Sequence, residues 1–224
     1  MSRMMIISAA VAVIGVGAYF LTTPGSNSVT LADPLGAANA QDAAVIDTSI
    51  IEDMTLGNPD SPVTVIEYAS FTCPHCASFH EGPYKQLKED YIDTGKINFV
   101  YREVYFDRYG LWASMIARCA GSAEAFFGIS DLIYQGQSVW TRAGEPAAIV
   151  DELRKIGLVA GLDANTMEAC LQDGDMARTL VAWYQENAEA DEVNSTPTLV
   201  INGRKHSNMS YPELKDVLDD LLGE

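Results

Sequence analysis

Basic residues are scarce in this sequence. It has 14 lysines and arginines against 31 aspartates and glutamates, which gives a formal net charge of −17 at pH 7. Proteins that bind nucleic acids use clustered Lys and Arg to displace counterions from the phosphates, and no such cluster occurs here. The composition therefore argues against a nucleic-acid partner and indicates an acidic, well-solvated surface.

Lysine and arginine are absent altogether between Arg3 and Lys85. Within that gap, residues 4–21 carry no charge and consist mainly of Ile, Val, Ala, Gly and Met. An uncharged apolar run behind a basic residue is typical of an export signal or a membrane anchor, and residues 1–22 are interpreted as one or the other. The charge bias places the amino terminus inside, so we expect the folded part in the periplasm or another extracytoplasmic compartment, either secreted or anchored to the inner membrane.

Residues 23–48 lack the apolar side chains that a folded core requires. They are rich in Pro, Gly, Ser, Ala and Asn, which predicts a linker. The segment Ala38-Asn39-Ala40 has the small-x-small form of a cleavage site, but it lies far from the apolar run. The sequence leaves open both a cleaved signal and an uncleaved anchor followed by a tether.

The chain has only four cysteines and three histidines, which limits its capacity to bind metals. A zinc site needs about four ligands. Outside the motif Cys73-Pro74-His75-Cys76, the remaining cysteines and histidines are scattered without ligand spacing. We expect neither a metal nor a cofactor. A metallochaperone or assembly factor that binds copper or zinc through Cys73, Cys76 and His75 is the alternative from another functional class.

A β-branched and aromatic run at residues 63–71 predicts a buried strand directly before the cysteine motif. Apolar side chains at helical spacing follow the motif and predict a helix, and a second strand at 97–101 completes a βαβ unit. The later predicted elements are a helical block at about 107–191, a strand at 198–201 with a turn at Asn202-Gly203, and a last helix at 211–222.

The two cysteines of the motif occupy the predicted corner between strand and helix. A thiolate is the reactive form of cysteine, and the unpaired N–H groups and dipole of a helix N-terminus lower its pKa. Cys73 has that position, and Cys76 lies one turn further on, close enough to form a disulfide with it. His75 can add a donor or a positive charge, and Pro74 suits a first helical turn. The pattern predicts thiol–disulfide exchange at Cys73 and Cys76.

The order of these elements resembles the DsbA family of thiol–disulfide oxidoreductases. The resemblance covers about residues 50–222 and rests on the Cys-Pro-His-Cys motif behind a strand, the helical block, and Thr196-Pro197 before a hairpin. It implies an α/β, thioredoxin-like fold over residues 49–224 with a large α-helical insertion at about 107–191. It also implies an enzyme that forms disulfide bonds in unfolded or reduced exported proteins and is reoxidised by a membrane quinone-linked, DsbB-like partner.

Glu67 interrupts an otherwise apolar strand, on the same side as Val65 and Ala69. Burial of a carboxylate there is costly and is expected to raise its pKa. Glu67 is therefore a candidate proton acceptor and donor for Cys76, and the DsbA family is similar in having an acidic residue at this place. A Glu67 held in a salt bridge is the alternative. His80, one turn beyond Cys76, is expected to be a satisfied helix residue rather than a catalytic one.

Thr196-Pro197 precedes the predicted hairpin. The resemblance implies a cis Pro197 that faces the cysteine pair, with the backbone of Thr196 free to pair with an extended substrate segment. Thr rather than Val before this proline resembles the isomerase branch of the superfamily. A periplasmic disulfide reductase or isomerase is therefore the alternative function, and the direction of electron flow stays open.

Cys119 and Cys170 both fall in the predicted helical block. An even number of cysteines in an exported protein indicates a further disulfide, so this pair is predicted to form a structural bridge. Such a bridge stabilises the fold by about 4 kcal/mol if it acts by restricting the unfolded chain. The alternative is a second redox pair that relays electrons.

Overall fold

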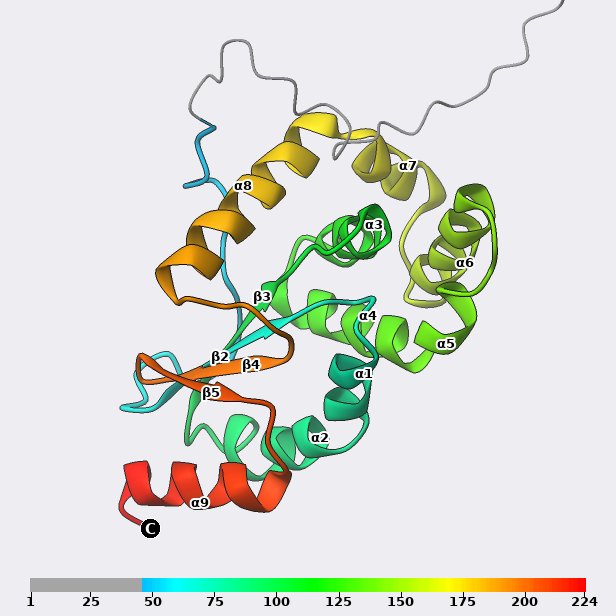
Figure 1. The fold of residues 1–224 in the computed structure, drawn as a ribbon. Helices are drawn as coiled ribbons and strands as arrows, with labels where there is room; N and C mark the ends of the chain where they lie inside the picture. Colours follow the sequence, from blue (N-terminus) through cyan, green and yellow to red (C-terminus); the bar gives the residue numbers. More distant parts are fainter. Residues whose placement is uncertain (1–45) are drawn as a thin grey trace, which may run out of the picture. The chain divides into compact units, whose positions relative to one another are not determined.

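The computed structural model describes residues 46–224 (Figure 1). The predicted signal or anchor at 1–22 and nearly all of the predicted linker at 23–48 lie outside the described residues. Within residues 46–224, no helix combines the length and the apolar character needed to cross a membrane.

A mixed β-sheet forms the centre of the described part, with strand order β1-β3-β2-β4-β5. Its central strands β2 and β3 are parallel, and every other neighbouring pair is antiparallel. The strands are β1 (Met54–Gly57), β2 (Thr64–Ala69), β3 (Asn98–Glu103), β4 (Thr198–Ile201) and β5 (Arg204–Ser207). The strands predicted around the cysteine motif are confirmed with shifted ends, whereas the short edge strand β1 was not predicted.

The helices described fall into two groups along the chain. The first group connects β2 to β3 or follows the sheet: α1 (Pro74–Glu81), α2 (Pro83–Leu87), the π-helix η1 (Lys88–Ile92) and α9 (Tyr211–Leu222). The second group lies between β3 and β4: α3 (Arg108–Arg118), α4 (Ala123–Gln135), α5 (Gln137–Trp140), α6 (Pro146–Val159), α7 (Ala164–Gln172) and α8 (Gly174–Ala190). This second group is the predicted helical insertion, which lies in the sequence between the βαβ unit and the hairpin of β4 and β5.

The two faces of β2 bury different partners. Side chains alternate between the faces of a strand, so Val65, Glu67 and Ala69 point to one side and Ile66 and Tyr68 to the other. The first face belongs to the main apolar core, which α1 and α9 also help to form. The second face packs against α8, which lies on that side of the sheet in Figure 1. Both faces of β2 are therefore covered, which explains its nearly continuous apolar sequence.

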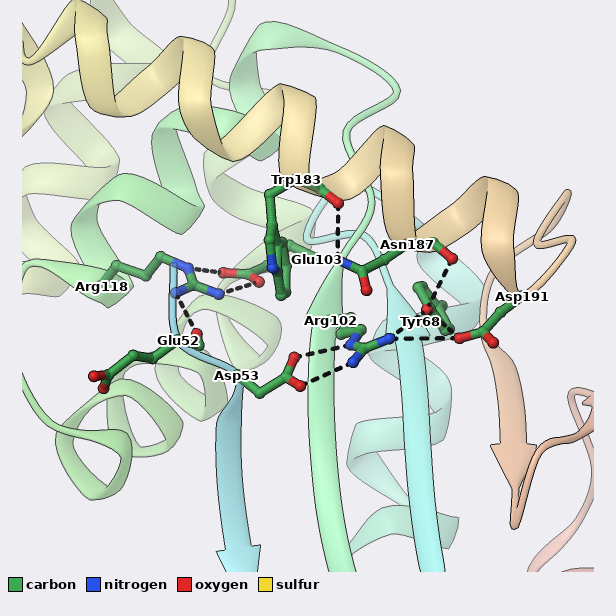
Figure 2. A network of polar contacts seen from close by, with 9 residues as sticks. All are labelled: Glu52, Asp53, Tyr68, Arg102, Glu103, Arg118, Trp183, Asn187 and Asp191. Atoms are coloured by element: carbon green, nitrogen blue, oxygen red, sulfur yellow. Dashed lines mark hydrogen bonds and ion pairs between the residues drawn. The ribbon is translucent and has the colours of Figure 1, made fainter. Parts of the chain in front are cut away.

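A buried ion pair attaches the helical insertion to the sheet (Figure 2). Glu103 at the end of β3 is 1% exposed and accepts hydrogen bonds from Arg118 of α3, at 2.6 Å from Nε and 2.7 Å from Nη2. The Ser114 hydroxyl donates a third bond to the same carboxylate, at 2.8 Å. The carboxylate is thus compensated by both charge and hydrogen bonds, as a buried ion needs to be.

A second arginine extends this network across the sheet. Arg102 binds both carboxylate oxygens of Asp53, at 2.8 and 2.9 Å, and donates to the hydroxyl of Tyr68 at 2.9 Å. The Trp183 ring of α8 lies between the two arginines, with the guanidinium of Arg118 5.3 Å and that of Arg102 5.9 Å from it (Figure 2). Cation–π contacts of this kind add to the packing of α8 on the sheet.

Substitution of Glu103 tests this attachment. Glu103→Ala leaves Arg118 buried without its carboxylate, so we expect the free energy of unfolding to fall by about 3 kcal/mol, as when one partner of a buried pair is removed. Denaturant titration measures the change. Glu152→Ala is the matched control because its partner Lys155 is 66% exposed, and we expect a loss below about 1 kcal/mol there. Equal losses in the two variants would contradict a buried, structural ion pair.

Candidate active site

The cysteine motif lies at the turn from β2 into α1. Cys73 is the N-cap residue of α1, and Pro74 occupies the first helical position, where the missing N–H costs no hydrogen bond. The turn is held by a bond from the Cys73 N–H to the Ser70 carbonyl, at 3.0 Å, and by the Thr72 hydroxyl, which donates to Asp107 at 2.8 Å. The predicted corner is therefore present, with Cys73 at the open end of a helix.

Cys73 is partly exposed, and its surroundings favour the thiolate. The pKa of its thiol falls from 9.0 to about 5, first because the Cys76 thiol donates to it. The Thr196 side chain and the backbone N–H groups of Cys76 and His75 contribute further, against the opposing effect of burial. His75 thus acts through its backbone, and its imidazole, expected to assist the thiolate, is exposed to solvent. The first cysteine is the one that the helix N-terminus activates.

Cys76 has the opposite character. It is fully buried, and burial raises the pKa of its thiol well above 9.0, with the hydrogen bond to Cys73 and the negative charge of Glu67 acting in the same direction. Both thiols are free in this structure. One helical turn therefore holds an activated thiol and a thiol that keeps its proton.

Glu67 is fully buried on β2 and pairs with His80 of α1. The His80 Nε2 atom lies 3.1 Å from one carboxylate oxygen and 3.0 Å from the other. The burial predicted for Glu67 is present, and so is the salt-bridge partner that the sequence left as the alternative. His80 is satisfied, as expected, but its partner is the candidate proton acceptor of the site.

Thr196 and Pro197 face the cysteine pair from the segment before β4. Their peptide bond is cis, and the Thr196 carbonyl lies 3.5 Å from the Cys73 sulfur. The Thr196 hydroxyl is buried and has no geometric hydrogen-bond partner among residues 46–224, although its side chain lowers the pKa of Cys73. The fold therefore brings Thr196, Pro197 and the two cysteines together across more than a hundred residues.

Gln137 is a site residue that the sequence did not indicate. It is buried at the start of α5, and its side-chain amide donates to the carbonyls of Phe71 and Cys73, at 2.8 and 2.9 Å. One amide from the insertion thus holds the turn on both sides of Thr72. No motif marks such a glutamine, because its partners are backbone atoms about 65 residues away.

Cys119 and Cys170 form a disulfide, with an S–S distance of 2.05 Å and a Cα–Cα distance of 6.0 Å. The bridge joins the end of α3 to α7 within the insertion. The bridge lines a cavity of about 340 Å³, and Met115 and Met176 line the same cavity. Within residues 46–224, no group of three or more His, Cys, Asp or Glu side chains is arranged to hold a metal ion.

A strand-to-helix corner with Cys-x-x-Cys at the helix N-terminus, facing a cis-proline segment, defines a thioredoxin-fold protein with a redox-type cysteine site. The family model described as thioredoxin matches residues 49–220. The chain belongs to this family, and its relatives include DsbA-like proteins.

Two relatives by sequence and one by structure illustrate the match. An inferred protein-disulfide oxidoreductase of Rickettsia bellii is 34% identical over 172 residues, which are 77% of this chain and 65% of the relative, less than two thirds of its length. Disulfide bond formation protein D of Bacillus subtilis is 24% identical over 196 residues, 81% of this chain and 82% of that protein. The crystal structure of Wolbachia pipientis α-DsbA1 matches with a TM-score of 0.70 and 26% identity, covering 77% of this chain and 92% of the other. The predicted thioredoxin-like fold and the DsbA resemblance are confirmed.

The pKa of Cys73 is open to direct measurement. We expect the alkylation rate of the reduced protein by iodoacetamide to follow a titration with its midpoint near pH 5, because only the thiolate reacts. The pKa of Cys73 in the folded protein lies below the unfolded value of 9.0. The Cys73 thiolate therefore stabilises the reduced fold fully above pH 9.0, and this stabilisation is lost as the pH falls towards 5. A midpoint near 9 would contradict the activation of Cys73.

Proposed function

We propose that this protein is a thiol–disulfide oxidoreductase that donates disulfide bonds to exported proteins. The observation that carries the proposal is the contrast between Cys73, whose surroundings favour the thiolate, and Cys76, which is buried and keeps its proton. Stabilising the reduced form of a cysteine pair makes its disulfide a stronger oxidant. The contrast therefore favours transfer of the disulfide from enzyme to substrate.

The exchange proceeds in two displacements. A substrate thiolate attacks the Cys73 sulfur of the oxidised enzyme, the Cys73–Cys76 bond breaks, and Cys76 leaves and takes up a proton. A second substrate thiolate then attacks the substrate sulfur of the mixed disulfide, and Cys73 leaves as a thiolate. Two electrons pass from the substrate dithiol to the enzyme, which ends with Cys73 as thiolate and Cys76 as thiol.

Glu67 is proposed as the acid–base group for Cys76. It is the buried carboxylate whose charge acts on the Cys76 thiol, and thiolate formation at Cys76 is unfavourable unless the proton can move nearby. Glu67 gives a proton to Cys76 when the enzyme disulfide opens and takes it back when the disulfide re-forms.

The Thr196 backbone is proposed as the substrate contact. Its carbonyl lies against the Cys73 sulfur at 3.5 Å, next to cis Pro197, so a substrate segment whose cysteine reaches Cys73 also reaches this backbone. Extended peptides bind such segments by main-chain hydrogen bonds, which suits unfolded chains of varied sequence.

The proposed substrates are reduced or unfolded exported proteins, and the proposed site of action is extracytoplasmic. After each turnover, the reduced pair needs an acceptor for two electrons, which we assign to a membrane quinone-linked partner. The charge pattern of residues 1–22 and the relation to disulfide bond formation protein D support this assignment.

A reductase or isomerase is the second candidate, because it would use the same cysteines in the opposite direction. Thr196 favours it, because Thr rather than Val before the cis proline resembles the isomerase branch of the superfamily. The two functions differ in the reduction potential of the Cys73–Cys76 couple.

Equilibration against glutathione buffers distinguishes the two directions. Thioredoxin-fold couples run from about −270 mV for thioredoxin to about −120 mV for DsbA, and we expect this couple near the oxidising end. Mass analysis after alkylation counts the Cys73–Cys76 and Cys119–Cys170 pairs separately. Cys76→Ala is the control, because it removes the couple and leaves the bridge in the insertion. A potential near the thioredoxin value would make the protein a reductant or isomerase.

A further inference from the structure

His80 completes a buried cluster beneath the cysteines. It lies four residues after Cys76 in α1, so both side chains project from the same face of the helix. That face packs on β2, where Glu67 meets His80 at 3.0 and 3.1 Å. Glu67 is fully buried and His80 is 3% exposed. The helix thus carries a thiol and an imidazole one turn apart; the imidazole binds the Glu67 carboxylate, and the charge of that carboxylate acts on the thiol.

Aromatic rings enclose the His80 imidazole. The Tyr134 ring of α4 stacks on it with 4.2 Å between the ring centroids, and the Tyr84 ring of α2 lies 4.4 Å away. The Tyr101 ring of β3 meets it edge-on at 5.9 Å, and the Tyr101 and Tyr134 hydroxyls bond each other at 2.7 Å. This box excludes solvent from the Glu67–His80 contact, so a proton there is exchanged within the protein.

The groups that face His80 differ in their capacity to exchange that proton. Burial raises the pKa of Tyr84, Tyr101 and Tyr134, so these hydroxyls stay protonated throughout the working pH range. The groups of the cluster that can exchange a proton are then Cys76, Glu67 and His80. An imidazole is suited to this position because its ring nitrogens can both donate and accept a proton.

We infer that His80 holds the proton of the buried pair, so that Glu67 and His80 together accept and return the proton of Cys76. This inference rests on the proposed function and goes beyond it by adding a positioning residue that acts through Glu67. When Cys76 is a thiol, the pair lacks the shared proton, and the carboxylate accepts from a neutral imidazole. When Cys76 attacks the mixed disulfide at Cys73, its S–H proton passes to the pair, the new S–S bond forms, and the substrate thiolate leaves.

Glu67 needs His80 as a partner because burying the charge of its carboxylate alone is costly. A lone carboxylate in this enclosed position keeps its proton tightly and is then no acceptor for Cys76. An imidazole within 3.1 Å of both oxygens stabilises the carboxylate by donating to it and can take the charge that arrives with the proton. The imidazole thus stabilises the buried carboxylate by a hydrogen bond before the proton arrives, and the pair is neutral overall after it has arrived.

The experiment follows Cys76 after reduced enzyme is mixed with oxidised glutathione. Rapid acid quench and mass analysis separate the attack of Cys73, which forms the mixed disulfide, from the later attack of Cys76, which releases glutathione. For His80→Gln, which keeps a donor without a titrating group, we expect the Cys76 step to slow at least tenfold at pH 7. We also expect its pH midpoint to rise by at least one unit, while the Cys73 step stays within twofold of the unchanged protein.

Two further variants make the test specific. His80→Lys places a fixed cation beside Glu67 that does not give up its proton at neutral pH, so it should not restore the Cys76 step. His206→Gln makes the same chemical change on β5 and should leave both steps unchanged. An unaltered pH profile in His80→Gln would overturn the inference and leave His80 as a packing residue. Full rescue by His80→Lys would also overturn it, because a fixed cation would then be sufficient.

Glu67→Gln separates this inference from the proposed function. If Glu67→Gln leaves the Cys76 step and its pH profile unchanged, the acid–base role of Glu67 fails, and the role of His80 fails with it. If Glu67→Gln slows the step and His80→Gln does not, only the inference fails. The double variant replaces the charged pair by two amides and provides the test where His80→Gln alone does not fold: we expect it to match Glu67→Gln, and a further tenfold loss would show that His80 does not act through Glu67.

Discussion

The first turn of α1 gives two cysteines, three residues apart, opposite electrostatic surroundings. Cys73 stands where the helix leaves its N–H groups unpaired, and these groups together with the Cys76 thiol favour a negative sulfur. Cys76 is buried in the apolar core, where desolvation disfavours a negatively charged sulfur. Gln137 and Asp107 hold the turn that carries Cys73, and Cys76 is fully buried in the core.

Buried charge occurs on both parallel central strands, and the fold treats the two cases differently. Glu103 on β3 is bound by Arg118, a cation that does not lose its proton, together with a serine hydroxyl, so this pair is suited to a permanent attachment of the insertion. Glu67 on β2 is bound by an imidazole, whose ring nitrogens can both donate and accept a proton. The charge of Glu67 acts on the Cys76 thiol, and this is why the second pair, and not the first, is proposed to take part in proton transfer.

The sequence predicted the elements whose signals are local. The strand before the motif, the helical insertion and the last hairpin follow from side-chain periodicity and turn residues, and Cys73 and Cys76 follow from spacing. β1 was missed because four residues of an edge strand show too little alternation. Gln137 and the Glu67–His80 contact depend on tertiary packing: each joins groups from separate elements, and no periodicity records which polar side chain meets which backbone or carboxylate.

The lowered pKa of Cys73 also couples the proposed exchange to pH. A substrate dithiol carries two protons below about pH 8.5, the ordinary range for cysteine. The reduced enzyme carries one proton on its pair above about pH 5, because Cys73 is a thiolate and Cys76 is a thiol. Counted over these thiols, each transfer of a disulfide to substrate releases one proton, so the thiols shift the equilibrium towards disulfide formation by about tenfold per pH unit between these limits. The same electrostatics that activate Cys73 thus make disulfide donation more favourable as the pH rises from about 5 towards about 8.5 and weaken it in acid.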